Sequence, residues 1–210
     1  MVLEAHRGSV DRFLLPVANR MLDVNPNSLT WIAFFFAVLA GFLFYLGGVL
    51  FLFAAAFCVF LNALFDALDG RIAKLTGKAS DRGDFLDHVL DRYADIFMLG
   101  GISFSAYCGL RIGILAVLGV LLASYMGTQA QAVNVGRDYG GVLGRADRLV
   151  VLFLAALAQM IADPGGMLFI GLGGYGFRIL EWSMILFAVF GNLTAIQRGL
   201  STWKKLSRVK

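Results

Sequence analysis

The sequence predicts an all-α integral membrane protein, with six transmembrane helices preceded by an N-terminal amphipathic helix at the membrane interface. Of its 210 residues 59% are hydrophobic and 19 are Phe, and the mean hydropathy is +0.77. A soluble domain of this size could not bury so much apolar surface. The formal net charge of +4 and the pI of 9.3 indicate a basic face against anionic membrane lipids, and no nucleic-acid partner is expected.

The N-terminal segment, residues 1–25, is expected to be the amphipathic surface helix, running over about residues 3–22. Its apolar residues recur at helical spacing with charged residues between them, a pattern typical of a helix lying in the interface. Asn25-Pro26-Asn27 breaks this helix, and Asn27 or Ser28 is expected to cap the next one.

Residues 26–210 are expected to form one membrane domain of six apolar helices. Several of their uncharged cores are long enough to cross a bilayer, which takes about 18–20 residues. The acidic start of the third helix must face water or protein and not lipid. The helices are expected at residues 29–46, 49–74, 82–110, 112–135, 146–162 and 180–197, the fifth ending at Asp163-Pro164-Gly165-Gly166.

Lys and Arg gather at alternate ends of these helices. One side of the membrane receives the groups around Arg20, Lys74, Arg145 and Arg198, whereas the other receives only Arg111 and Arg178. Basic residues favour the cytoplasmic side. The sequence therefore predicts a multi-pass protein of the cytoplasmic membrane, with both termini and the acidic cluster on the cytoplasmic side.

Half of the 14 acidic residues lie in one short window of the second and third helices. Asp66 and Asp69 are i, i+3, and Asp87 and Asp91 are i, i+4, so each pair lies on one helix face. Two such faces brought together form a site for one or two hard cations, Mg²⁺ or Mn²⁺, and predict an enzyme whose substrate carries phosphates. Asp95 lies one turn beyond, and whether it orients Arg92 or Tyr93 stays open.

The same stretch reads Asp66-Ala-Leu-Asp69-Gly70-Arg-Ile-Ala73-Lys74, followed after eight residues by Gly83, Asp87 and Asp91. It resembles the signature D-x-x-D-G-x-x-A-R-x8-G-x3-D-x3-D of the CDP-alcohol phosphotransferase family. Lys74 stands where the family usually has Arg, which keeps the charge but loses bidentate phosphate geometry. The resemblance implies a transferase that uses a CDP-linked lipid and forms homodimers.

The resemblance also implies roles for individual residues. The four signature aspartates are expected to bind metal, and Asp91 is also the expected base that takes the proton of the acceptor alcohol. Asn27 and Thr30 match the family's Pro-Asn-x-x-Thr pattern. The residues expected near the nucleotide are Gly70, Ala73, Lys74, Asn27 and Thr30.

Three further segments, residues 83–95, 127–133 and 143–149, are similar to those of archaeal archaetidylinositol phosphate synthases, which join CDP-archaeol to myo-inositol phosphate. Bacterial phosphatidylinositol phosphate synthases are similar too, with arginines at the positions of Arg145, Arg148 and Arg198. These three arginines are expected to bind the phosphate of inositol phosphate. The alternative is that they only orient the protein in the membrane.

The expected reaction transfers the lipid phosphate group from CDP-archaeol or CDP-diacylglycerol to inositol phosphate and releases CMP. One alternative keeps this chemistry with glycerol phosphate or serine as the acceptor. Another is a cation- or proton-coupled transporter that uses the carboxylates as an ion site. A transporter would more naturally place acids at mid-membrane depth in several helices, whereas these acids gather at one end of two.

Overall fold

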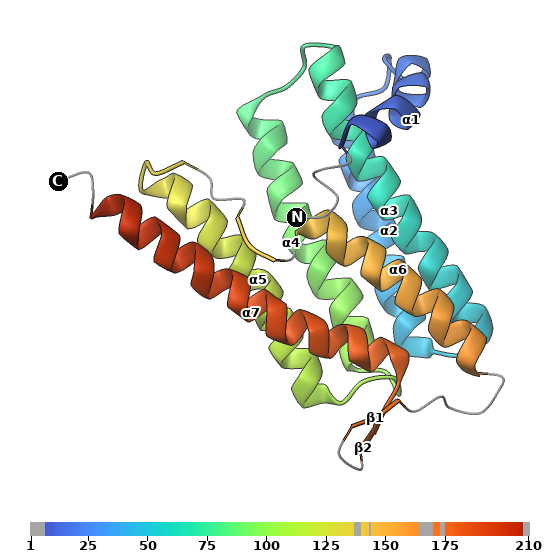
Figure 1. Cartoon of the computed structure of the whole chain (residues 1–210). Helices are drawn as coiled ribbons and strands as arrows, with labels where there is room; N and C mark the ends of the chain where they lie inside the picture. The colour runs from blue at the N-terminus through green and yellow to red at the C-terminus, as the bar shows by residue number, and fades with distance from the viewer. Residues whose placement is uncertain (1–6, 137–139, 143, 164–169, 173–174, 208–210) are drawn as a thin grey trace.

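The computed structural model describes residues 7–136, 140–142, 144–163, 170–172 and 175–207. Figure 1 shows that this part of the chain is helical apart from one short hairpin, so the all-α class is confirmed. The antiparallel hairpin, with Ile170 opposite Phe177, was not predicted. The elements are α1 (Arg7–Arg20), α2 (Pro26–Leu46), α3 (Val49–Leu75), α4 (Asp81–Ser103), α5 (Leu110–Ala132), α6 (Arg145–Ala162), β1 (Ile170–Leu172), β2 (Tyr175–Phe177) and α7 (Ile179–Leu206).

Four helices in the described residues, α2, α3, α5 and α7, are long and apolar enough to cross a membrane. The first half of α4 is acidic, and α6 begins with Arg145, Asp147 and Arg148, so neither meets the same criterion. The count of six spans therefore stays a prediction, as does the interfacial place of α1. The predicted start of α1 at residue 3 and the break at Pro164-Gly165-Gly166 lie outside the described residues.

Several predicted helix ends are wrong by up to a few turns. The N-cap of α2 is Asn25, whose side chain accepts a hydrogen bond from the Asn27 N–H at 3.0 Å, so Asn27 and Ser28 already lie inside the helix. Pro26 at the first helical position needs no hydrogen-bond partner for its nitrogen, which favours this earlier start. Helix α4 ends at Ser103 instead of residue 110, and α7 continues to Leu206 instead of ending at residue 197.

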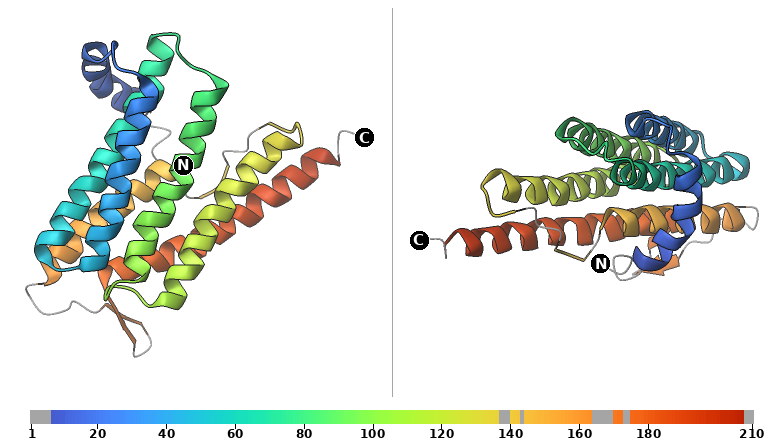
Figure 2. Two further views of the ribbon diagram at one scale, coloured as in Figure 1. Left: turned by 180° about the vertical axis from the view of Figure 1, so that it is seen from behind. Right: turned by 90° about the horizontal axis from the view of Figure 1, so that it is seen from above.

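Helix α2 packs against both α3 and α4, α6 packs against α3, and α5 pairs along its length with α7. Figure 2 shows the α5–α7 pair splaying away from the group formed by α2, α3 and α4. The backbones meet at glycines: Gly41 of α2 lies directly against Gly101 of α4, and a Cβ added at Gly191 of α7 would be 2.8 Å from the backbone of Gly119 on α5. Such small-residue contacts are typical of helices that associate in membranes.

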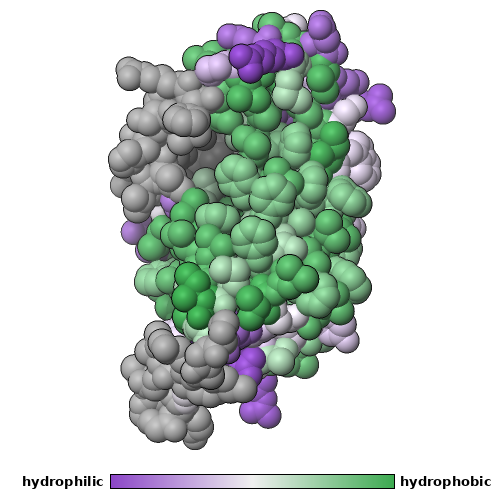
Figure 3. Space-filling view, turned by 90° about the vertical axis from the view of Figure 1, so that its right-hand side faces the viewer, coloured by the Kyte–Doolittle hydropathy of each residue, from purple (hydrophilic) through white to green (hydrophobic). Residues whose placement is uncertain are grey.

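Large apolar side chains cover the outer surface of the helices. On α2 and α3 alone, six aromatic residues are more than half exposed: Trp31, Phe35, Phe42, Tyr45, Phe53 and Phe57. Figure 3 shows a hydrophobic belt between two polar ends of the molecule. Soluble monomers rarely expose so large a contiguous apolar surface, so the chain is a membrane protein.

Hydrogen bonds of the Tyr107 hydroxyl connect three loops at the end of the molecule near the hairpin. The Tyr107 hydroxyl donates to Asp163 Oδ2 at 2.6 Å and accepts from the Gly48 N–H at 2.8 Å, and the guanidinium of Arg178 lies 5.1 Å from the ring centroid. Burial, and then the Asp163 carboxylate, raise the pKa of Tyr107, and burial raises the pKa of Cys108 to about 12. Both groups therefore stay protonated at neutral pH.

Candidate metal and phosphate site

The end of α3 and the start of α4 place the aspartates. Helix α3 ends at Leu75, and Gly77, with φ of 66°, lets the chain reverse in a left-handed conformation that favours glycine. Ser80 then caps α4, its Oγ accepting from the Gly83 N–H at 3.2 Å. The chain thus returns with Asp87 and Asp91 about two and three turns inside α4 and close to the last turns of α3.

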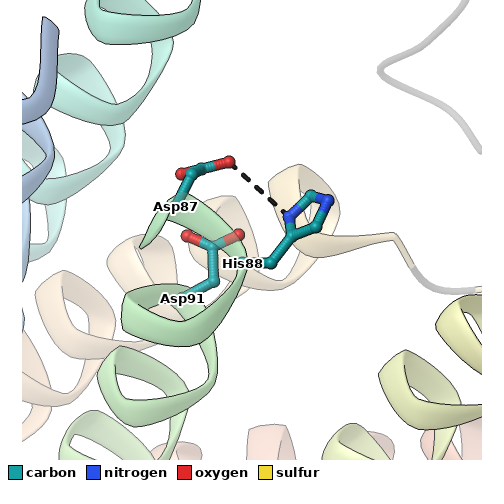
Figure 4. A group of neighbouring side chains, drawn as sticks. All are labelled: Asp87, His88 and Asp91. Atoms are coloured by element: carbon teal, nitrogen blue, oxygen red, sulfur yellow. Dashed lines mark ion pairs between the residues drawn. The ribbon is translucent and has the colours of Figure 1, made fainter. Parts of the chain in front are cut away.

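The structure brings the two predicted aspartate faces together. One carboxylate oxygen from each of Asp66, Asp69 and Asp87 lies within 4.8 Å of the others. Asp87, His88 and Asp91 form a second group within the same limit, and Figure 4 shows these three side chains projecting from neighbouring turns of α4. The His88 Nδ1 is 3.7 Å from Asp87 Oδ2, and its Nε2 is 3.3 Å from Asp84 Oδ1.

The three-aspartate group fits a hard divalent cation. Asp69 Oδ2 and Asp87 Oδ1 are buried and have no hydrogen-bond partner in the described part of the chain. Buried anionic oxygens that face one another need a positive charge between them. All-oxygen donors are what Mg²⁺ and Mn²⁺ prefer, so this group fits them better than the one that includes the His88 imidazole.

Two positive side chains contact the aspartates: Arg92, whose Nη1 is 3.5 Å from Asp91 Oδ2, and Arg145 at the start of α6. The Arg145 Nη1 lies 2.6 Å from Asp66 Oδ1 and 2.7 Å from Asp91 Oδ1, so one guanidinium bridges α3 and α4. The start of α6 is fixed by Asp147, whose carboxylate accepts a hydrogen bond from the Gly144 N–H at 3.1 Å. Because Arg145 uses oxygens predicted to bind metal, a cation on the same oxygens would repel it.

The other two predicted arginines lie in different surroundings. Arg148 Nη2 is 2.8 Å from Asp95 Oδ2, and both residues are more than nine-tenths buried. Arg198, on α7, donates to the carbonyl oxygens of Gly140 at 2.7 Å and Ala123 at 2.6 Å. The sequence left undecided whether Asp95 orients Arg92 or Tyr93 on its own helix. In the structure its ion-pair partner is Arg148 of α6.

The residues predicted to lie near the nucleotide come from the start of α2 and the last turns of α3. A Cβ added at Gly70 would meet nothing within 4 Å, so there is space next to Asp69. Lys74 is exposed and Ala73 is half-buried one turn further along α3. Thr30 lines a small cavity with Asp66 and Asp91. The Asn27 side-chain oxygen is 3.4 Å from the position of a Cβ at Gly83.

A carboxylate cluster with neighbouring arginines at one end of a helical membrane protein is typical of membrane enzymes that use divalent metal to act on phosphates. Residues 23–193 match the family model "CDP-alcohol phosphatidyltransferase", and the chain belongs to this family. It is therefore a phosphotransferase of phospholipid biosynthesis, and the transporter alternative is set aside.

Two archaeal relatives cover most of the chain. The archaetidylinositol phosphate synthase of Pyrococcus horikoshii is 30% identical over 178 residues, 85% of this chain and 88% of that protein. The synthase of the same name from Methanothermobacter thermautotrophicus is 29% identical over 206 residues, 98% of this chain and 96% of that protein.

The fold matches crystal structures of the phosphatidylinositol phosphate synthase of Mycobacterium tuberculosis. The structure with CDP-DAG bound has a TM-score of 0.72 at 26% identity and covers 91% of this chain and 94% of that one. The structure in complex with manganese and citrate also has a TM-score of 0.72, at 26% identity, and covers 90% of this chain and 88% of that one.

Proposed function

We propose that this protein transfers the archaetidyl or phosphatidyl group of a CDP-linked lipid to a hydroxyl of myo-inositol phosphate and releases CMP. The observation that carries this proposal is the meeting of Asp66, Asp69 and Asp87 within 4.8 Å, beside open space at Gly70 and in contact with Arg145 through Asp66. The names of the archaeal and mycobacterial relatives support the choice of inositol phosphate as acceptor.

The aspartates Asp66, Asp69, Asp87 and Asp91 would hold one or two Mg²⁺ or Mn²⁺ ions. The ions would neutralise the diphosphate of the CDP-lipid and stabilise the phosphate that leaves with CMP. Two buried carboxylate oxygens without a hydrogen-bond partner in the described residues, Asp69 Oδ2 and Asp87 Oδ1, are the atoms best placed for this role.

The nucleotide would lie along the open side of α3. Gly70 and Ala73 are small enough to let it approach the helix backbone, and the Lys74 ammonium would attract its phosphates. Asn27 and Thr30, at the start of α2, would border the same space.

Asp91 would act as the base. Its carboxylate takes the proton of an inositol hydroxyl, the freed oxygen attacks the phosphorus on the lipid side, and the bond to the CMP oxygen breaks. The Arg145 guanidinium lies 2.7 Å from Asp91 Oδ1, on an oxygen that the hydroxyl proton would have to reach. We therefore infer that Arg145 turns from Asp91 towards the acceptor phosphate as the reaction begins, with Arg198 as a second phosphate ligand and Arg148 supporting the site from deeper in the molecule.

In the membrane, α4 and α6 would span the bilayer with the four more apolar helices, and α1 would lie in the interface. The excess of Lys and Arg at the end that holds the aspartates favours a cytoplasmic location for the site and for both termini. A homodimer is the proposed assembly, on the basis of the family resemblance.

The test is CMP release by the purified protein with a CDP-lipid, in Mg²⁺, in Mn²⁺ and in excess chelator. The acceptors compared are inositol phosphate, inositol, glycerol phosphate and serine. Metal-dependent release only with inositol phosphate is the expected result. Release with another alcohol keeps the metal chemistry and overturns the acceptor, and release in the presence of chelator overturns the metal role.

A further inference from the structure

Asn62 is a buried polar residue that the proposed reaction leaves without a role. It lies on α3 one turn before Asp66, and only 1% of its surface is exposed. Its Nδ2 donates a hydrogen bond to the Ala33 carbonyl oxygen on α2 at 2.9 Å, which fixes the orientation of the amide. The other amide atom, Oδ1, is buried and accepts no hydrogen bond within the described residues, which is unfavourable unless something donates to it.

Arg145 also has a buried polar atom without a hydrogen-bond partner in the described residues. Its Nη1 is used by Asp66 and Asp91, but its Nε is buried and has no acceptor in the part of the chain described. Asn62 Oδ1 lacks a donor and Arg145 Nε lacks an acceptor, so one small molecule that does both could satisfy the two. Asn62 and Arg145 line the same cavity, together with Thr30, Asp66 and Asp91.

This cavity has room for one water molecule. The volume open to the centre of a water-sized sphere is about 10 Å³, close to the minimum of about 10–15 Å³ that a buried water needs. Apolar side chains of α2 and α4 form the rest of the wall. A buried water usually makes about three hydrogen bonds. Here it can donate to Asn62 Oδ1 and to one carboxylate, and accept from Arg145 Nε.

We propose that Asn62 is a positioning residue that holds one ordered water molecule against the carboxylates of Asp66 and Asp91. The water links both aspartates to the α2 backbone through Asn62 and Ala33, and so arranges them before a cation arrives. This inference rests on the proposed metal role of the two aspartates. Groups that orient metal ligands typically affect metal affinity by about 10–100-fold when they are removed.

The first test is a calorimetric titration of Mn²⁺ into the full chain in lipid nanodiscs. Asn62→Leu removes the amide and keeps a similar volume, and we expect Mn²⁺ to bind about tenfold more weakly. Asn192→Leu is the matched control, because Asn192 also donates to backbone carbonyls, those of Leu115 and Ala188, but does not line the cavity. Its Mn²⁺ affinity should equal that of the unaltered protein. Unchanged affinity in folded Asn62→Leu overturns the proposal.

The second test needs no variant and holds even if Asn62→Leu fails to fold. An experimental structure that resolves ordered water should show density between Asn62 Oδ1 and a carboxylate of Asp66 or Asp91, and a dry cavity overturns the proposal. Neither test measures CMP release. Weaker Mn²⁺ binding in Asn62→Leu without CMP release from the unaltered protein would remove the proposed reaction and keep this site. CMP release by the unaltered protein, with unchanged Mn²⁺ affinity in Asn62→Leu, would support the proposed reaction and overturn the role of Asn62.

Discussion

Two arginines one turn apart on α6 pair with aspartates in different ways. The inner pair, Arg148 with Asp95, joins one positive to one negative side chain, and the two side chains are 8% and 6% exposed. The outer arginine, Arg145, is 19% exposed and contacts two aspartates of a cluster assembled from α3 and α4. The inner pair is balanced in charge, although Arg148 Nε has no acceptor in the described residues, whereas the outer cluster keeps carboxylate oxygens without a donor there.

This difference separates a structural ion pair from an exchangeable one. A buried one-to-one pair is strongly destabilised when one partner is removed, and it has no spare charge with which to bind a ligand. A cluster with excess negative charge can exchange its arginine for a metal ion, and the arginine that leaves can contact an anionic substrate. We therefore expect Arg145 and its cluster to affect catalysis, and the Arg148–Asp95 pair to affect the stability of the fold.

The largest expected effect follows from removing the charge of Asp91. Asp91→Asn should lower kcat for CMP release by about 10²–10⁴-fold, the usual contribution of a general base. Binding of the CDP-lipid should change much less, because Asp66, Asp69 and Asp87 remain. Initial rates and a lipid-binding measurement on the same preparation check this. A variant that retains the full rate would show that another group accepts the proton.

The inner pair should affect stability more than chemistry. Asp95→Asn leaves Arg148 buried without a counter-charge, which typically costs about 3–5 kcal/mol of unfolding free energy. Denaturant unfolding in mild detergent measures the loss, and added Mn²⁺ should not restore it.

The double variant Asp95→Asn/Arg148→Met is the control, because it removes both charges. It should recover most of the lost stability, since apolar replacements of buried ion pairs are often neutral or stabilising. A double variant no more stable than Asp95→Asn would mean that Arg148 has a role beyond this pair.

Removing Arg145 should raise the affinity of the site for Mn²⁺. Arg145→Gln abolishes the cation that competes for Asp66 and Asp91, so Mn²⁺ should bind about tenfold more tightly, the equivalent of one charged hydrogen bond that no longer has to be broken. Without metal the variant should unfold at lower temperature than the unaltered protein, and Mn²⁺ should restore it.

Arg198→Gln is the matched control for this measurement. Arg198 donates to the Gly140 and Ala123 carbonyl oxygens, whereas Arg145 contacts Asp66 and Asp91. Its Mn²⁺ affinity should stay unchanged. If both variants bound Mn²⁺ more tightly to the same degree, the cause would be a general charge effect. The contact of Arg145 with the aspartates would then not distinguish it from other arginines.

The sequence predicts contacts well where they lie within one helix. The spacings of Asp66 with Asp69 and of Asp87 with Asp91 determine helix faces through the 3.6-residue repeat alone. The signature then implied that the two faces meet. No local rule indicates that Arg145 reaches Asp66 and Asp91, or that Arg148 pairs with Asp95, because these contacts depend on how α6 packs in three dimensions.

The missed residues share this dependence on packing. Asn62 falls in an apolar run and reads as one polar residue in a membrane helix, and only the position of Ala33 on α2 shows what its amide does. Tyr107 and Asp163 likewise come from separate loops. A polar residue at helical spacing from a metal ligand, as Asn62 is from Asp66, is the one signal that could have identified it.

The smallest expected effect concerns Arg198. Arg198→Ala should raise the KM for inositol phosphate severalfold, and leave the KM for the CDP-lipid and the Mn²⁺ affinity unchanged. The effect should be smaller than for Arg145, because Arg198 already uses Nε and Nη1 on backbone carbonyls, and fewer of its five donors remain for a phosphate. Equal increases in KM for both substrates would assign Arg198 to membrane orientation or packing, and would leave Arg145 as the arginine that distinguishes the acceptor.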